Sequence, residues 1–111
     1  METLFNGRLS IEVSAHGAEL CSIFSNGKEY LWQADPAFWK RHSPVLFPIV
    51  GSVWENKYRN EGTTYVLTQH GFARDMEFTL ISEENDEVRY QLVSNEETLK
   101  KYPFPFRLTI G

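Results

Sequence analysis

An Asn-Gly pair between two strand-like segments is the feature that most restricts how this chain can fold. Asn26 and Gly27 both tolerate the positive φ angles of a type I′ turn, so they predict a tight β-hairpin. The arms of this hairpin are predicted at Leu20–Phe24 and Glu29–Trp32. Because the two arms of a hairpin pair antiparallel, the chain is expected to contain antiparallel sheet.

Alternating apolar and polar residues predict further strands along the chain. A strand is expected from Thr63 to Leu67 after a turn at Gly62, and a second hairpin is expected to close at the polar turn Glu83–Asp86. The other strand positions that share an apolar face are Leu9, Ile11 and Val13; Phe78 and Leu80; Val88, Tyr90 and Leu92; and Phe104, Phe106, Leu108 and Ile110. Many short strands with regular turn signals predict an antiparallel β-sandwich.

Helix is predicted at only two short segments. Asp35 and Pro36 suit the cap and the first position of a single helical turn. Ser94 and Glu97 match the S-x-x-E pattern of a capping box, which predicts a short helix before the last strand. Between these segments the run SPVLFPIVG is apolar but contains prolines, and it predicts a buried, irregular strand or loop.

Length, charge and cysteine content exclude several classes of protein. The 111 residues fit one domain, and a net charge of −4 provides no general attraction for nucleic acid or anionic lipid. The single cysteine, Cys21, allows no disulfide within the chain, and the N-terminus lacks the pattern of a signal peptide. No apolar run reaches membrane-spanning length, so a cytoplasmic protein without membrane or nucleic-acid partners is expected.

The strand pattern that begins at Phe104 is still running at Gly111. Because a domain rarely stops beside a row of exposed hydrophobic side chains, residues 1–111 are expected to be the N-terminal, incomplete part of a single β-sandwich domain. Such a part would expose much apolar surface, so poor solubility or self-association of the isolated piece is expected.

The stretch TQHGFARD places a histidine and an arginine around a Gly-Phe turn. His70 could hydrogen-bond a ligand hydroxyl, or it could be a surface histidine bonded to backbone. Arg74 offers a planar fork of donors suited to a carboxylate, a phosphate or sugar hydroxyls, or it could pair with Asp75 or Glu77. The residues leave both interpretations open. Phe72 is expected to anchor the turn in the core.

Residues near the first helical turn are weaker candidates. Arg41 and His42 could touch a polar ligand, or they could lie in solvent at the end of that turn. At most one or two of the nearby aromatic residues are expected in a site, the group being Trp32, Phe38, Trp39 and Trp54. No metal site is expected, since His16, His42 and His70 match no zinc spacing, and Cys21 is expected to be buried and inert.

Four stretches, GAELCSI, RHSPVLFPIVG, QHGFARDMEF and ETLKKYPFPFRLTI, resemble the aldose 1-epimerase (galactose mutarotase-like) family over nearly the whole chain. The lactose-operon mutarotase-like branch is the most similar one, and a hexose-6-phosphate epimerase branch shares the HGFAR pattern. The resemblance implies a large β-supersandwich made by chains much longer than this one, of which these residues would be the N-terminal portion.

By resemblance, the full-length protein is an isomerase that interconverts the α and β anomers of an aldose by ring opening. A carboxylate takes the proton of the anomeric hydroxyl and a histidine protonates the ring oxygen, so no cofactor is needed. The motifs of the base glutamate and the acid histidine do not occur here. The residues that match are those of the sugar-binding wall, Arg41, His70 and Arg74, with His70 orienting the substrate and so supporting catalysis.

The expected ligand is a small sugar, an aldohexose that could carry a phosphate. Ser52 stands where relatives often have a basic residue, which favours a neutral sugar. Two alternatives stay open: a non-catalytic carbohydrate-binding or sensing protein on the same fold, and a β-scaffold whose partner covers the final strand. Should this chain catalyse alone, the candidate pair would be His70 with Glu55, Glu61 or Asp75.

Overall fold

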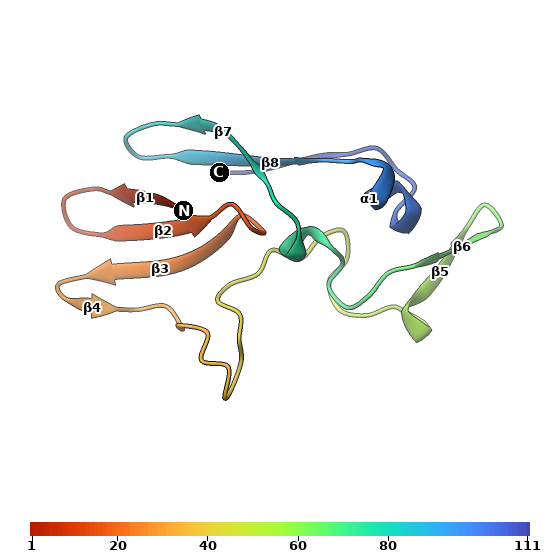
Figure 1. The fold of residues 1–111 in the computed structure, drawn as a ribbon, viewed down its shortest axis with the longest axis horizontal. Coiled ribbons are helices and arrows are strands. Elements are labelled where there is room, and N and C mark those ends of the chain that lie inside the picture. The colour runs from red at the N-terminus through yellow and green to blue at the C-terminus, as the bar shows by residue number, and fades with distance from the viewer.

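The computed structural model describes all of residues 1–111 and consists mainly of β-strands in three antiparallel sheets (Figure 1). The first sheet has the order β1-β2-β3-β4, the second pairs β5 with β6, and the third has the order β7-β8-β9. The strands are β1 (Glu2–Phe5), β2 (Ser10–Ser14), β3 (Glu19–Ser25), β4 (Lys28–Glu29), β5 (Lys57–Asn60), β6 (Thr63–Val66), β7 (Thr79–Glu83), β8 (Val88–Val93) and β9 (Arg107–Ile110). The helical elements are α1 (Glu96–Lys101) and the 3₁₀ turns η1 (Trp54–Asn56) and η2 (Ala73–Asp75). The predicted fold class, mainly β with antiparallel pairing, is confirmed.

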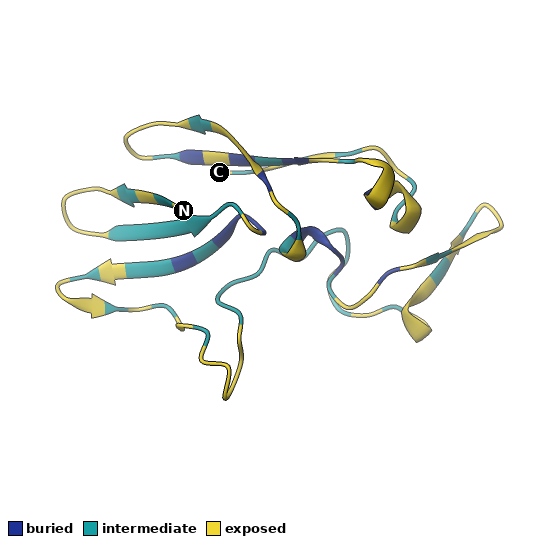
Figure 2. Cartoon of the chain, viewed as in Figure 1, coloured by how far each residue is buried: buried dark blue, intermediate teal, exposed yellow.

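The molecule is a flat slab. Its principal extents are 55 × 34 × 15 Å. Its radius of gyration is 16.3 Å, against about 13 Å for a compact domain of this length. The first and third sheets lie next to one another at one end of the slab, and the β5–β6 hairpin forms the opposite end (Figure 1). Buried residues number 13 of 111, so most side chains are half-buried or exposed (Figure 2).

A small core joins the first and third sheets. Tyr90 in β8 is fully buried, and its hydroxyl donates to the backbone oxygen of Val13 in β2 at 3.4 Å. Just before β7, the amide of Phe78 donates to the backbone oxygen of Ala15 at 2.8 Å. The buried members of the core cluster are Ala18, Leu67, Phe72, Ala73, Phe78, Val88, Tyr90 and Leu92. Val88, Tyr90 and Leu92, which were predicted to share the apolar face of one strand, are therefore buried in this core.

The first hairpin forms where the sequence predicts it. Asn26 and Gly27 have φ angles of 50° and 74° and join β3 to β4. The second arm is shorter than predicted, because its register ends at Glu29. The carboxylate of Glu29 accepts hydrogen bonds from the amides of Ile23 and Leu31, at 2.8 and 2.9 Å. The side chain of Glu29 thus occupies backbone amides that would pair between strands if the hairpin were longer, and the chain leaves the sheet after Glu29.

The second hairpin, β7 to β8, is also present, and its turn lies one residue later than predicted. The amide of Glu84 donates to the backbone oxygen of Glu87 at 2.7 Å and closes this turn. Phe78 is buried, but Leu80 is 37% exposed. The pairing register shifts between Leu80 and Ser82, so the strand does not keep the simple alternation that the sequence predicts.

The helix before β9 is present, but its predicted cap is wrong. Asn95 rather than Ser94 is the N-cap, since its side chain accepts from the amide of Thr98 at 2.9 Å. The Thr98 hydroxyl accepts in return from the amide of Asn95 at 2.9 Å, so Glu97 has no part in the capping box. The hydroxyl of Ser94 instead accepts from the amide of Phe106 at 3.1 Å, which ties the segment before the helix to the start of β9.

Two strands were not predicted from the sequence, β1 and β5. Each has four residues, too few to show alternation clearly, and each forms one arm of a hairpin. The strand predicted after Gly62 is confirmed as β6, which ends at Val66. None of the helical segments has the length and apolar character needed to span a bilayer.

Candidate functional site

The segment Gln69–Asp75, called the inner turn below, crosses the middle of the slab between β6 and β7 (Figure 1). The amides of Phe72 and Ala73 both donate to the backbone oxygen of Phe47, at 3.0 and 3.2 Å. The Phe72 ring packs edge-on against Phe47 and in a tilted arrangement against Phe106. Since Phe72 is buried, the prediction that it anchors this turn is confirmed.

Two glycines let other backbone approach the inner turn closely. Gly71 has a φ of +73°, and a Cβ atom there would lie 2.2 Å from the backbone oxygen of Phe47. Gly17, in the connection between β2 and β3, has a φ of +74°, and its Cβ would lie 2.7 Å from the backbone oxygen of Arg74. No side chain fits at either position without a backbone shift. The inner turn is therefore clamped between two other segments.

His70 is bonded to Gly51 through both its backbone and its ring. The amide of His70 donates to the backbone oxygen of Gly51 at 2.8 Å, and the amide of Gly51 donates to Nδ1 of His70 at 2.8 Å. His70 itself has a φ of 64°, which is uncommon outside glycine. These two hydrogen bonds hold the imidazole in one orientation beside the loop that carries Gly51.

Asp75 lies between two arginines. The Nη2 atom of Arg41 donates to Oδ1 of Asp75 at 3.0 Å, and Nε of Arg74 is 4.0 Å from Oδ2. Nη2 of Arg74 donates to the backbone oxygen of Gln69 at 3.1 Å, while its Nε is buried and bonds to nothing in the chain. Two positive charges and one negative charge leave a local excess of one positive charge. The pairing of Arg74 with Asp75, one of the two sequence interpretations, is present only as a long contact.

The strand residue Glu19 holds the segment that carries Arg41. Its carboxylate oxygen Oε1 accepts from the amides of His42 and Ser43, at 2.8 and 2.9 Å. The hydroxyl of Ser43 donates to the backbone oxygen of Leu20 at 2.7 Å. Glu19 is the only charged residue among the buried ones, and a buried carboxylate needs such donors. The backbone after Arg41 is thereby fixed to β3.

One cavity brings two of the three predicted site residues together. It has a volume of about 490 Å³, and His70 and Arg74 line it with Trp39. The other lining residues are Ser43, Pro44, Leu46 and Gln69. Arg41 does not line the cavity. Its ion-pair partner Asp75 does not line it either, and lies 4.0 Å from Nε of Arg74, which does. An aromatic face, a ring nitrogen and a guanidinium thus surround one space.

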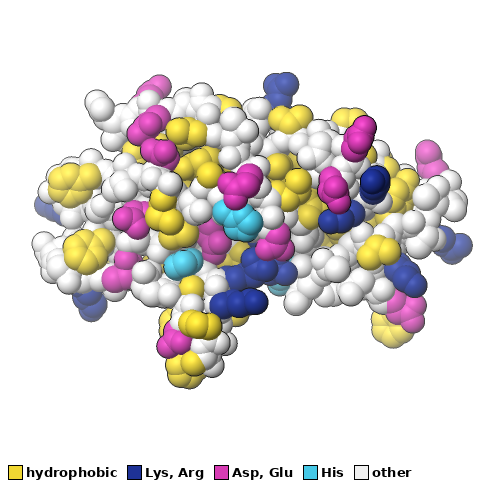
Figure 3. Space-filling model, in the orientation of Figure 1, with side chains coloured by type: hydrophobic (Ala, Val, Ile, Leu, Met, Phe, Trp, Pro, Cys, Tyr) yellow, Lys and Arg dark blue, Asp and Glu magenta, His cyan; other side chains and the backbone are white.

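Trp39 belongs to a protruding segment, Asp35–Lys40, which is called the outer turn below. All six residues of this segment are exposed. The predicted cap is present, since the side chain of Asp35 accepts from the amide of Ala37 at 2.9 Å. The indole of Trp32 donates to the backbone oxygen of Trp39 at 2.7 Å. Figure 3 shows hydrophobic side chains at this protrusion, with histidines and charged side chains gathered above it near the middle of the face.

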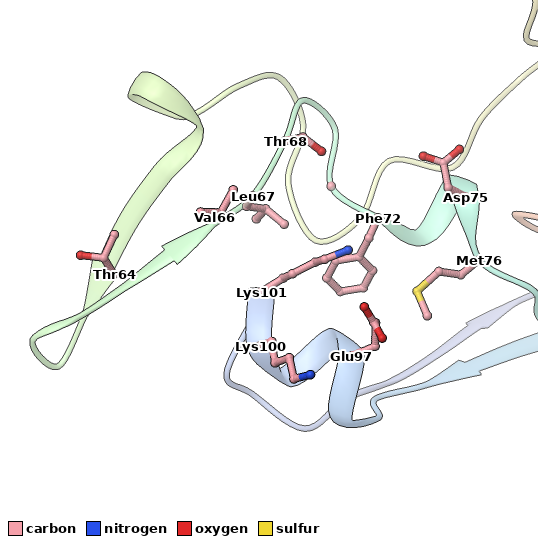
Figure 4. Close-up of a pocket in the computed structure, with 11 residues that line it drawn as sticks. Thr64, Val66, Leu67, Thr68, Phe72, Asp75, Met76, Glu97, Lys100 and Lys101 are labelled. Carbon is pink, nitrogen blue, oxygen red and sulfur yellow. The ribbon is translucent and has the colours of Figure 1, made fainter.

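A second cavity, of about 520 Å³, lies on the far side of the inner turn, between β6 and α1 (Figure 4). Lys101 points toward Phe72, and Glu97 lies between Lys100 and Met76 in this view. Although this cavity is the larger one, it contains neither His70 nor Arg74. Its basic groups come from exposed helix positions, and nothing in its arrangement singles out a ligand.

The other sequence candidates lie outside the first cavity. The backbone amide of His42 donates to the carboxylate of Glu19, and its imidazole does not line the first cavity. His16 pairs with Glu77 at 2.8 Å, so Glu77 is not the partner of Arg74. Trp54 is 86% exposed and lines a different depression beside β5, so it lies outside the cavity that Trp39 lines.

Cys21 is buried, as predicted, and burial raises the pKa of its thiol, with the nearby Glu19 carboxylate adding to the effect. A thiol of this kind is a weak nucleophile at neutral pH. No group of three or more His, Cys, Asp or Glu side chains is placed to hold a metal ion.

Two site features were missed from the sequence. Glu19 stands between Ala18 and Leu20, directly before a predicted strand, and a lone acid in such a place is a signal for a buried acceptor. The contact between Gly51 and His70 joins positions nineteen residues apart. No local pattern predicts it, because it depends on how the loop before η1 folds back.

Comparison with known proteins places this chain in a family. The sequence matches the aldose 1-epimerase family over residues 2–111, so the chain belongs to that family. Protein LacX of Lactococcus lactis subsp. lactis is 36% identical over 118 residues, which cover 96% of this chain and 38% of LacX. The resemblance inferred from the four sequence stretches is confirmed.

Solved structures show the same fold. A galactose mutarotase related enzyme from Lactobacillus acidophilus is 43% identical with a TM-score of 0.93, over 97% of this chain and 37% of that one. A galactose mutarotase-like protein from Lactobacillus casei is 39% identical with a TM-score of 0.94, over 98% of this chain and 38% of that one. The chain thus spans less than two fifths of the length of these relatives.

Proposed function

We propose that this chain supplies one sugar-binding wall of a mutarotase-like isomerase that interconverts the α and β anomers of an aldose by ring opening. The observation that carries the proposal is the cavity in which His70 and Arg74 meet Trp39. Family membership over residues 2–111 supports the reaction class. We further propose that these residues form part of a larger β-sandwich domain, since they match 37–38% of the length of the related structures.

The chemistry of the cavity suits a sugar. Hexoses present hydroxyl groups around the ring edge and C–H groups on the ring faces, and an indole packs against such faces. Trp39 offers that surface, while His70 and Arg74 offer hydrogen-bonding groups. Arg41 then acts through Asp75, which it holds beside Arg74. In this proposal His70 orients the substrate, and the proton-transferring acid and base come from elsewhere in the full-length protein.

A neutral aldohexose is the proposed ligand. Asp75 cancels one of the two arginine charges, so the site keeps a single excess positive charge rather than two. A phosphate group carries close to two negative charges near neutral pH and is bound best by several donors and cations together. The ion pair between Arg41 and Asp75 therefore favours a neutral sugar over a sugar phosphate.

Anomer exchange in glucose and galactose, followed by NMR, tests the reaction. In the full-length protein, His70→Ala or Arg74→Ala is expected to slow exchange and weaken sugar binding by about tenfold or more, equivalent to losing one hydrogen bond worth about 1.4 kcal/mol. Trp54→Ala is the control, because that side chain lies outside the cavity. Wild-type exchange and affinity in both site variants would contradict the proposal.

A non-catalytic carbohydrate-binding or sensing protein is the second candidate. The observation that favours it is that the cavity contains one histidine and no carboxylate, so it lacks an acid and base pair of its own. If the full-length protein binds a hexose at Trp39 but leaves the anomer exchange rate at its uncatalysed value, this second function replaces the first.

A further inference from the structure

The two nitrogens of His70 have separate tasks in the structure. Nδ1 accepts a hydrogen bond from the amide of Gly51 at 2.8 Å. A backbone N–H can only donate, so Nδ1 carries no proton of its own while this bond exists. In a neutral imidazole the single proton then resides on Nε2. The ring makes its one hydrogen bond within the chain through Nδ1, which leaves Nε2 available, and His70 lines the cavity with Trp39 and Arg74.

We propose that Gly51 is a positioning residue for the sugar site, because its amide fixes the Nε2–H form of His70 and makes this side chain a hydrogen-bond donor toward the cavity. As a donor, His70 selects an acceptor oxygen on the ligand, such as a hydroxyl or ring oxygen. This inference rests on the proposed sugar-binding function and adds the direction of the hydrogen bond to it.

The backbone around this pair is built to hold it. The amide of His70 donates to the backbone oxygen of Gly51 at 2.8 Å, so the ring and the amide of one residue bond to both polar groups of the other. Gly51 has a φ of +82° with open space at its Cβ position, and His70 has a φ of 64°. Both residues thus adopt the left-handed conformation, and the neighbouring Gly71 packs on Phe47. The imidazole cannot turn without breaking the bond to Gly51.

The donors available in the cavity agree with this assignment. Nη2 of Arg74 donates to the backbone oxygen of Gln69, and the guanidinium as a whole can only donate. His70 in its Nε2–H form adds a second donor. Among the polar residues that line the cavity, His70 and Arg74 therefore offer N–H groups to acceptor oxygens of the sugar.

The first test reads the tautomer directly and needs no sugar. Nitrogen NMR of the His70 ring in this chain at neutral pH is expected to show a proton on Nε2 and none on Nδ1, with the amide of Gly51 exchanging slowly. A proton on Nδ1 would overturn the inference whatever the chain binds.

The second test separates the two nitrogens by substitution. In His70→Asn the amide oxygen can still accept from Gly51, but the distant donor is gone; asparagine also tolerates the positive φ. In His70→Gln the side-chain NH₂ can reach the place of Nε2, while the near acceptor is lost. The Gly51 amide should therefore stay protected in the Asn variant and exchange about tenfold faster or more in the Gln variant.

Galactose and glucose titrations, read by tryptophan fluorescence in proteins that keep Trp39 and carry Trp32→Phe and Trp54→Phe, complete the test. The Gln variant is expected to bind more weakly than wild type but about tenfold more tightly than the Asn variant. Equal affinity of the two variants, or tighter binding by the Asn variant, would overturn the donor role. If wild type keeps the Nε2–H form but binds neither sugar, the proposed sugar site fails, and the donor role of His70 toward a ligand fails with it.

Discussion

The inner turn and the outer turn meet at the same cavity but are held in different ways. In the inner turn, Gly71, Phe72 and Ala73 are buried, and the amides of Phe72 and Ala73 donate to the backbone oxygen of Phe47 in a distant loop. The outer turn is exposed throughout and is held by local bonds to Asp35 and from Trp32. Local opening requires less free energy where few buried contacts are lost. One wall of the cavity is thus fixed by the fold, and the opposite aromatic wall can move independently.

The largest expected effect belongs to Gly71 in the inner turn. Gly71→Ala would place a Cβ atom 2.2 Å from the backbone oxygen of Phe47 at a φ of +73°. The left-handed strain and the forced backbone shift together should lower the free energy of unfolding by about 3 kcal/mol or more. Urea denaturation followed by circular dichroism measures this loss.

The matched control is Gly62→Ala, because Gly62 has a φ of +82° with open space at its Cβ position. Gly62→Ala introduces the left-handed backbone strain without a steric clash, and it should lower the free energy of unfolding by about 1 kcal/mol. Equal losses for the two variants would show that the close approach to Phe47 does not hold the inner turn.

Substitution of Glu19, which holds the backbone just after the outer turn, is expected to give the next largest effect. Glu19→Ala leaves the amides of His42 and Ser43 without their acceptor. The expected loss is about 2 kcal/mol in the free energy of unfolding, together with faster hydrogen exchange of these two amides. Glu19→Gln keeps an acceptor oxygen and should lose less. Unchanged exchange in the Ala variant would refute the anchoring role.

Acid should loosen the segment around Glu29, which leads from β4 toward the outer turn. Hydrogen bonds from the hydroxyl of Ser22 and the amide of Leu31 lower the pKa of Glu29 below its ordinary value. A carboxylate with a lowered folded-state pKa stabilises the fold above its ordinary pKa, and this contribution is lost as the pH falls through the lowered value. The protection of the Ile23 and Leu31 amides from hydrogen exchange, measured relative to the intrinsic exchange rate at each pH, should therefore fall at acid pH.

A Glu29→Gln variant is the control for this acid effect. It has no ionisable group at this position, so the protection of the two amides, relative to intrinsic exchange at each pH, should no longer fall in that range. An unchanged acid response in the variant would assign the effect to another group.

The smallest expected effect is in the outer turn itself. Phe38 is 81% exposed and contacts Trp32 only edge-on, with 6.2 Å between ring centroids. Phe38→Ser should change the free energy of unfolding by less than about 0.5 kcal/mol, as is usual for exposed positions. Thermal melts of the two proteins should nearly coincide. A loss as large as that of Gly62→Ala would show that the outer turn is coupled to the core.

The hairpins were predictable from the sequence because their signals are local. Asn26-Gly27 supplies both positive φ angles, and the alternation of Val88, Tyr90 and Leu92 matches a buried strand face. The early end of β4 was not predictable in this way. It depends on the side chain of Glu29 bonding across to Ile23, a contact that alternation does not encode.

The candidate site was predictable only in part. His70 and Arg74 stand four positions apart on one turn, so a local pattern was enough to select them together. The sequence did not show that Asp75 would pair mainly with Arg41, because that pair joins positions 34 residues apart. It also could not choose Trp39 over Trp54, since exposure and direction depend on the loops around them.

Site-resolved NMR of this chain during titration with galactose and glucose tests whether the His70 cavity binds a sugar. We expect saturable shifts at the indole of Trp39, the amide of Gly51 and Nε–H of Arg74, with Lys101 in the larger cavity unaffected. Shifts confined to the cavity beside α1, or no saturable shift at the His70 cavity, would contradict the assignment of that cavity as the sugar-binding wall.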